Sequence, residues 1–150
     1  VAPLAKYAKG ATRSRSSPPK LVTLSNALVA VMAPPGVAGV DPDPARFGFW
    51  VENACLAHAW NAGQHVSYWR EEPVEVDGVL EGSWGSWAVE VKTGRFQMSD
   101  LKGLLEFTRR NPRFRPLILC DRAELPTAER AGVEAVTWQE FLLKGPPGSV

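Results

Sequence analysis

The stretch that decides the fold is Trp87–Lys92, which reads WAVEVK. Side chains on a β-strand alternate between its two faces, so Glu90 and Lys92 share one face and the apolar residues beside them share the other. A Glu-x-Lys pair of this kind is frequent on solvated strands. It therefore needs a second signal before it indicates chemistry.

The second signal is Asp77, in the apolar stretch Pro73–Leu80 (PVEVDGVL) just before it. This stretch also predicts a strand. Strict alternation along it puts Asp77 and Val79 on one face and Val76 and Leu80 on the other.

The two strands are joined by residues 81–86 (EGSWGS), a sequence typical of a hairpin turn. Folding the hairpin brings Asp77, Glu90 and Lys92 to one face. The alternative is a solvated face on which Lys92 forms an ion pair with Glu90 or with Asp77.

A third carboxylate, Glu52, lies on a predicted helix over residues 45–62. Asp43 is a favourable N-cap, Pro44 suits the first helical position and Gly63 suits the end. The apolar arc of this helix is formed by Phe47, Phe49, Val51, Cys55, Leu56, Ala59 and Trp60. Glu52 falls near the centre of that arc, where an unpaired charge is costly. We therefore expect it to pair with a buried cation such as Lys92, or to help bind a metal.

These residue types suit hydrolysis of phosphodiesters. Carboxylate oxygens are preferred ligands of Mg²⁺, and Mn²⁺ is the expected substitute. We expect Asp77, Glu90 and the Val91 carbonyl to bind the metal, with Glu52 as an outer ligand. Lys92 would stabilise developing negative charge or orient the attacking water.

The rest of the chain predicts an α/β fold with an αβββαβ core and a mixed central sheet flanked by helices. Further strands are expected at 4–7, 20–24, 66–70, 115–120 and 133–136. A short helix or turn is expected at 26–32, and further helices at 100–110 after a Ser99 cap, at 126–131, and from the Thr137–Glu140 capping box to 143. The expected division is a basic hairpin arm and linker at 1–43, the main domain at 44–144 and a tail at 145–150.

Charge is unevenly distributed in this 150-residue chain of net charge +1. Residues 1–40 contain no acid and five cations: Lys6, Lys9, Arg13, Arg15 and Lys20. This predicts DNA binding through phosphates without sequence readout, and the alternative is a solvated basic loop. Two isolated cysteines and two histidines without metal-ligand spacing indicate neither a disulfide framework nor a zinc site, and no long apolar run is present. We expect a cytoplasmic protein that does not contact a membrane.

The order of Glu52, Asp77 and Glu90-Val-Lys92 resembles the PD-(D/E)xK nuclease superfamily, in particular its Holliday-junction resolvase branch. A closer resemblance is to the carboxy-terminal domain of unknown function of prokaryotic AAA-type ATPases. The segments that carry it are Ser16–Leu21, Gly48–Asn53, Tyr68–Arg70, Glu75–Val79, Val89–Lys92 and Leu101–Phe107.

The resemblance implies a restriction-endonuclease-like fold and an ATPase module elsewhere in the same polypeptide. It also implies that the first 43 residues end a winged-helix-like segment. The departures are Val76 in place of proline, Gly78 in place of a bulky aromatic residue and Asn26 in place of aspartate.

Three functions are compatible with the sequence. The first is a Mg²⁺-dependent endonuclease domain acting on duplex or branched DNA, with a homodimer needed to cut two strands. The second is an inactive module of the same fold that binds DNA or a protein partner and regulates the ATPase. The third is a protein-interaction domain that uses exposed tryptophans.

Overall fold

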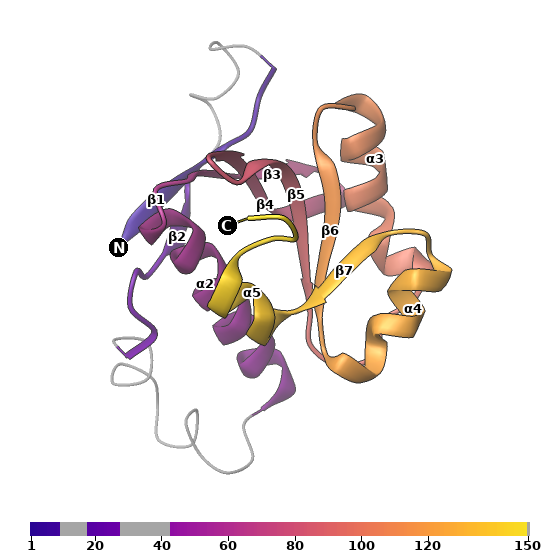
Figure 1. Ribbon diagram of the computed structural model, residues 1–150. Helices are drawn as coiled ribbons and strands as arrows, with labels where there is room; N and C mark the ends of the chain where they lie inside the picture. The colour runs from indigo at the N-terminus through magenta and orange to yellow at the C-terminus, as the bar shows by residue number, and fades with distance from the viewer. Residues whose placement is uncertain (10–17, 28–42, 150) are drawn as a thin grey trace.

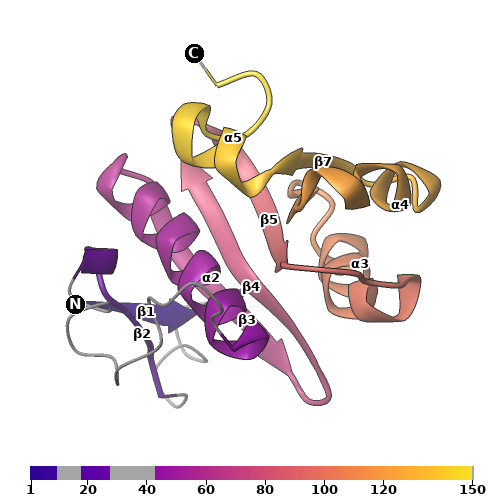
Figure 2. The same cartoon turned by 90° about the horizontal axis from the view of Figure 1, so that it is seen from below.

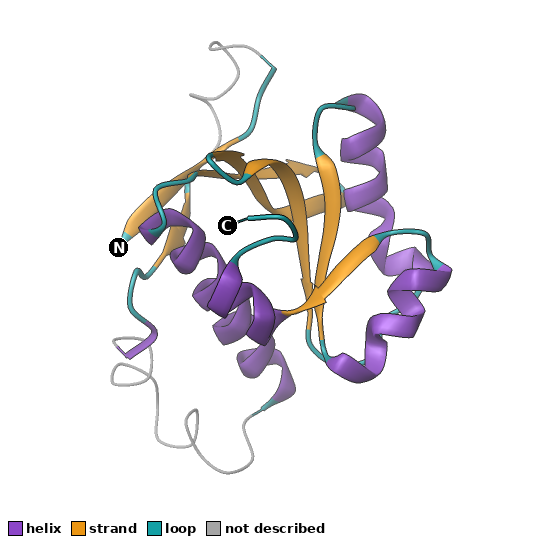
Figure 3. Ribbon diagram, in the orientation of Figure 1, coloured by secondary structure: helices purple, strands orange, loops and turns teal. Residues whose placement is uncertain are grey.

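Seven strands form one mixed sheet with helices on both faces (Figures 1 and 3). The computed structural model describes residues 1–9, 18–27 and 43–149. In chain order the elements are β1 (Ala2–Lys6), β2 (Lys20–Val22), α2 (Pro44–Asn61), β3 (His65–Glu71), β4 (Val74–Gly82), β5 (Gly85–Lys92), α3 (Lys102–Arg110), β6 (Arg115–Cys120), α4 (Leu125–Arg130), β7 (Glu134–Thr137) and α5 (Trp138–Lys144). The predicted mixed α/β class and the αβββαβ order of the core are confirmed.

The sheet order is β2-β1-β3-β4-β5-β6-β7. The β3–β4 and β4–β5 pairs are antiparallel, whereas β6 pairs parallel with both β5 and β7. The predicted amino-terminal hairpin forms as the antiparallel pair β1–β2, and β1 pairs parallel with β3. The hairpin therefore extends the sheet of the main domain. The helix expected at 26–32 and the linker expected at 33–43 lie mostly outside the described residues.

Two apolar clusters hold the layers together. On one face, α2 and α5 cover a cluster that includes Leu56, Trp87 and Phe141. On the other face, α3 and α4 cover a cluster that includes Leu104 and Ile118 (Figure 2). Residues 117–120 of β6 are fully buried and alternate between the two clusters, as their continuous apolar sequence predicts.

The helix ends follow local chemistry. The Asp43 carboxylate accepts from the Ala45 N–H at 3.1 Å, and Thr137 and Glu140 form the predicted capping box. The prediction that Ser99 caps the helix α3 is wrong. The chain enters α3 through a 3₁₀ turn at Met98–Leu101, and the Gln97 N–H donates to Asp100 at 2.8 Å instead.

Strict alternation fails in β4, which corrects the predicted faces. Ser67 of β3 pairs with Val79, but Trp69 pairs with Val76, so Asp77 and Gly78 both lie opposite Tyr68. This is a β-bulge, in which one extra residue shifts the alternation. As a result, Val76 and Val79 share the α3 cluster and Leu80 lies in the α2 cluster.

The aromatic side chains are mainly structural. Trp69 and Trp87 are buried, and the other four tryptophans are half-buried. The expectation that tryptophans are exposed is therefore wrong, whereas the protein-interaction function stays a prediction. Phe49, expected on the apolar arc of α2, is 55% exposed. Asn53 is buried in that region because residues 23–26 cover it through hydrogen bonds.

Candidate functional site: a buried carboxylate–lysine cluster

The cluster is built where β4 and β5 separate. Their pairing runs from the Gly82–Gly85 end of the hairpin to Gly78 opposite Val89. Asp77 comes next, and its Oδ2 atom accepts from the Val91 N–H at 2.8 Å. We call this point, where Asp77 of β4 faces Val91 of β5, the fork. A side chain there takes the place of a main-chain hydrogen-bond partner. Asp77 is only 8% exposed.

Close packing of α3 fixes the same end of β4. A Cβ atom on Gly103 would lie 1.9 Å from the Glu75 carbonyl oxygen, so no other residue fits there without moving the backbone. The start of α3 is therefore held directly against the strand that carries Asp77. Nearby, Asp100 lies close enough for its charge to act on Lys92.

Glu90 and Lys92 lie next to the fork on β5. Val89 and Val91 pack in the α2 cluster, so alternation turns Glu90 and Lys92 to the other side. Lys92 Nζ lies 2.7 Å from Glu90 Oε1. Because Asp77 lies in the bulge, it reaches Glu90 and Lys92 at the fork, and the three side chains do not share one regular face of the sheet as predicted. The second Glu90 oxygen, Oε2, is buried without a hydrogen-bond partner in the described structure.

Glu52 approaches from α2 and is paired with Lys20 of β2. The expected pairing of Glu52 with Lys92 is wrong, because Lys92 is paired with Glu90. The anomaly seen in the sequence is nevertheless real. The Glu52 carboxylate is mostly buried, and a cation 32 residues away compensates its charge.

Charge repulsion and burial act together on the carboxylates. Burial and the charge of Glu52 raise the pKa of Asp77 to about 6, against the opposing effects of Lys20 and the Val91 N–H. Burial and the charge of Asp77 raise the pKa of Glu90 to about 8, although Lys92 lowers it. Burial also raises the pKa of the neighbouring Cys55 thiol to about 12, with contributions from Glu52 and Asp77. Cys55 is therefore not a thiolate nucleophile.

The described residues contain no group of three or more His, Cys, Asp or Glu side chains placed to hold a metal ion by themselves. The oxygen atoms predicted to hold a cation here are those of Asp77, the Val91 carbonyl and Glu90, whose Oε2 has no hydrogen-bond partner in the described structure. Mg²⁺ accepts such a set, because it keeps several waters and takes phosphate oxygens as further ligands.

Three of the five residues expected to bind DNA lie in the described part of the chain, and two of these three are engaged within the fold. Lys20 is occupied by Glu52, and Lys9 Nζ donates to the Arg110 carbonyl at 3.2 Å. Lys6 is half-buried on β1. Arg13 and Arg15 lie outside the described residues.

One family model, "Domain of unknown function (DUF4143)", matches residues 47–141. The chain belongs to the DUF4143 family. The expectation of a domain of unknown function is thus confirmed, and the match does not bear on an ATPase or a nuclease. Comparisons with curated proteins and with solved structures give no match. In the part of the chain that the structure describes, no helix is long and apolar enough to cross a membrane.

Glu52, Asp77, Glu90 and Lys92 all lie inside the matched DUF4143 region, whereas Lys20 lies before it. Sequence reasoning assigned Lys20 to a DNA-binding arm and missed its place in the cluster. One signal was available, since Lys20 lies in Ser16–Leu21, one of the segments on which the resemblance to a domain of unknown function rests.

Proposed function

We propose that this DUF4143 chain is a metal-dependent phosphodiester hydrolase domain of the restriction-endonuclease-like class and acts on DNA. The observation that carries the proposal is the buried, unpartnered Oε2 of Glu90 beside Asp77 at the fork. Buried polar atoms without partners are uncommon in folded proteins and require an explanation, of which an absent ion is one. Two neighbouring carboxylates with raised pKa values are the kind of group that a divalent cation stabilises.

The roles follow from the positions. Asp77, Glu90 and the Val91 carbonyl would hold Mg²⁺ or Mn²⁺, and Glu52 would be an outer ligand. The ion would polarise the phosphoryl oxygen and lower the pKa of a coordinated water. Lys92, held beside Glu90, places a positive charge where the pentavalent phosphate becomes more negative.

Exposed cations near the fork support binding of a polyanion. Arg95 lies three residues after Lys92, and Lys102 lies at the start of α3 beside Gly103. Arg46 lies on the first turn of α2, near Gly48. A Cβ atom added at Gly48 would lie 3.0 Å from the Thr93 hydroxyl oxygen, so this turn is close to the residue after Lys92. None of these three cations forms an ion pair within the described residues. They are better placed than Lys9 or Lys20 to contact phosphates of a strand bound at the fork.

A second candidate is an inactive module of the same fold that binds DNA or a protein and regulates an ATPase module of the same polypeptide. The two ion pairs favour it, because Lys20–Glu52 and Lys92–Glu90 compensate two of the three carboxylates without a metal. This candidate leaves Glu90 Oε2 unsatisfied, so we rank it second.

The test is cleavage of supercoiled plasmid and four-way junctions in Mg²⁺ and in Mn²⁺. Wild type should nick or cut the DNA, and Asp77→Ala should lose both cleavage and Mn²⁺ binding. The measurement is repeated with the full-length ATPase polypeptide, since loading or dimerisation could depend on it. Mn²⁺ binding without cleavage in either form would favour the regulatory module, and absence of binding would exclude the metal-dependent mechanism.

A further inference from the structure

The segment that carries Lys20 is fastened to the main domain on both sides of that residue. Before it, the Tyr68 hydroxyl donates to the Pro18 carbonyl at 2.7 Å. After it, the Thr23 N–H donates to Asn53 Oδ1 at 3.0 Å, and Asn53 Nδ2 donates back to the Thr23 carbonyl at 2.9 Å. Asn53 directly follows Glu52. The position of Lys20 relative to Glu52 is therefore set by neighbouring contacts and not by the ion pair alone.

Lys20 itself is enclosed by the fold. Its side chain is 26% exposed, and that of Glu52 is 21% exposed. Its backbone pairs with Leu4 of β1 at the edge of the sheet. The charges of Glu52 and Asp77 both act on it and outweigh the effect of burial, so the pKa of Lys20 is raised. Lys20 is thus an ammonium group that is bound to Glu52 and lies within range of the charge of Asp77.

We propose that Lys20 is an internal counter-cation of the site. Its ammonium group binds the Glu52 carboxylate, which a divalent cation at the site would otherwise attract. The inference rests on the proposed metal-dependent function and adds a residue from outside the matched DUF4143 region. An ammonium group and a metal ion compete for the same carboxylate charge. Lys20 would keep the three carboxylates folded together before the metal arrives and would weaken metal binding by repulsion.

A purely structural role for Lys20 makes the opposite prediction. If Lys20 only fastened β2, its removal would loosen the site and weaken metal binding. If it is a counter-cation, its removal should strengthen metal binding, because a positive charge that is bound to Glu52 and acts on Asp77 is lost. The expected gain is about tenfold, or about 1.4 kcal/mol, which is the interaction of a unit charge with a dication about 6 Å away at the dielectric constant of water. The direction of the change therefore separates the two roles.

The experiment is calorimetric titration of Mn²⁺ into the whole chain, for wild type, Lys20→Met, Lys20→Arg and Lys6→Met. Methionine retains length without charge, and arginine retains charge. Lys6→Met is the matched control, since Lys6 lies on the neighbouring strand β1 of the same hairpin. We expect Lys20→Met to bind Mn²⁺ about tenfold more tightly, while Lys20→Arg and Lys6→Met stay close to wild type.

Equal or weaker Mn²⁺ binding by folded Lys20→Met would overturn this inference alone if wild type still binds. Absence of binding by all four proteins would overturn the proposed function together with it. Circular dichroism reports whether Lys20→Met folds. If it does not, acylation of lysines in wild type gives a second measurement. Mn²⁺ should increase labelling of Lys20 and not of Lys6, and unchanged labelling of Lys20 would contradict displacement.

Discussion

Two clusters of carboxylates and cations in this chain have the same chemistry and opposite electrostatics. On the surface of α3, Glu106 binds Arg109 and Arg110, whose hydrogen bonds lower its pKa to about 2. At the fork, burial and the charge of Asp77 raise the pKa of Glu90 to about 8, although Lys92 is only 2.7 Å away. An adjacent cation alone therefore does not decide the charge state of a carboxylate.

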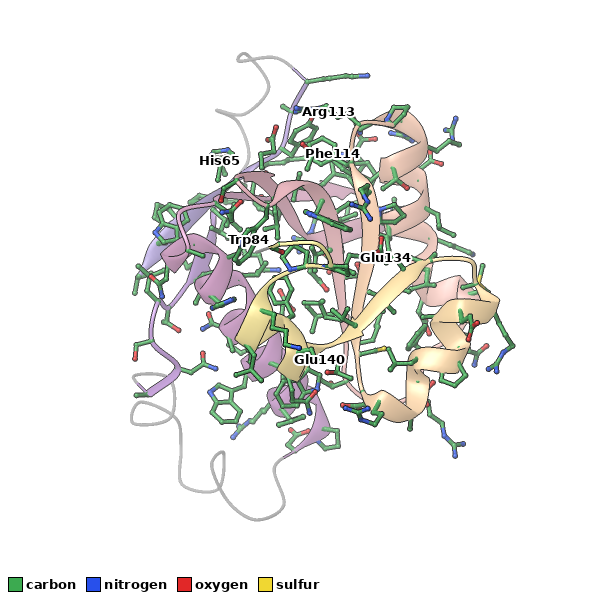
Figure 4. All side chains as sticks on the ribbon, in the orientation of Figure 1. His65, Trp84, Arg113, Phe114, Glu134 and Glu140 are labelled. Carbon is green, nitrogen blue, oxygen red and sulfur yellow. The ribbon has the colours of Figure 1, made fainter. Side chains whose placement is uncertain are left out.

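The difference lies in how completely each carboxylate is compensated. Both Glu106 oxygens accept hydrogen bonds from arginines in the same helix. Two exposed arginines in and just before β6 are satisfied similarly. Arg113 Cζ lies 4.5 Å from the centre of the Phe114 ring (Figure 4). Arg113 also binds Glu81, and Arg115 binds Glu134. The fork has three carboxylates for two lysines and one oxygen without a partner. The surface cluster is complete, whereas the fork lacks positive charge.

Catalysis should separate the two clusters most sharply. Lys92→Ala should reduce DNA cleavage at least about 100-fold, because removing one preorganised positive charge from the transition state costs this much. Mn²⁺ binding should be retained or strengthened, since Lys92 is not a ligand and its positive charge lies 2.7 Å from Glu90. Arg110→Ala is the matched control and should cleave at the wild-type rate. Cleavage that persists in purified Lys92→Ala would indicate a contaminating nuclease.

The pH dependence of stability should differ in sign between the clusters. Folded Asp77 and Glu90 have raised pKa values, so the folded state holds protons that the unfolded state releases between about pH 4 and pH 8. Their contribution to stability is present below this window and is lost as pH rises through it. The metal-free protein should therefore lose unfolding free energy across the window, by about 1.4 kcal/mol for each unit by which a folded-state pKa exceeds its unfolded value. Urea unfolding at several pH values in EDTA measures this loss.

Two variants show which carboxylates cause the dependence of unfolding free energy on pH. Glu90→Gln should flatten it between about pH 5 and pH 8, where Glu90 changes charge. Glu106 has a lowered pKa, so its contribution is present above the ordinary glutamate pKa and is lost as pH falls. Glu106→Gln should therefore change only the acid side of the curve. An unchanged slope in Glu90→Gln would mean that the fork does not repel its own charges.

A divalent cation should stabilise the fork and leave the surface cluster unaffected. At 100 times its dissociation constant, Mn²⁺ should add about 2.7 kcal/mol, or roughly 5–10 °C in Tm. The increase should be larger at pH 8.5 than at pH 5.5, because protons on Asp77 and Glu90 compete with the metal. Asp77→Ala should abolish it and Glu106→Ala should retain it. Thermal melts with Mn²⁺ and then with excess EDTA test all three points.

Features that depend on interactions between residues close in the sequence could be predicted, whereas features that depend on distant residues could not. The extent of α2, the strands β3–β6 and the Thr137–Glu140 capping box depend on local patterns, and they form as expected. Glu52 was correctly identified as a charge that needs compensation. Its partner was not identified, because Lys20 reaches it only through the sheet order that places β2 beside β1. The bulge at Asp77 was also hidden, since it is defined by the register against β3 and not by the residues of β4 alone.

The smallest expected effect is a change in the salt dependence of DNA binding, which should differ between cations with and without acidic partners. Each phosphate contact contributes about 0.9 to the slope of log K against log salt, so Arg95→Gln with Lys102→Gln should flatten the slope of DNA binding by about two. Arg109→Gln with Arg113→Gln removes the same charge from residues already bound to Glu106 and Glu81, and should change the slope little. Arg13→Gln with Arg15→Gln tests the amino-terminal arm, where a flattening of up to about two is also expected. Fluorescence anisotropy on duplex and four-way junction DNA over a salt series measures all three pairs. Equal slopes for the first two pairs would show that ion pairing on the surface does not control which cations reach the phosphates.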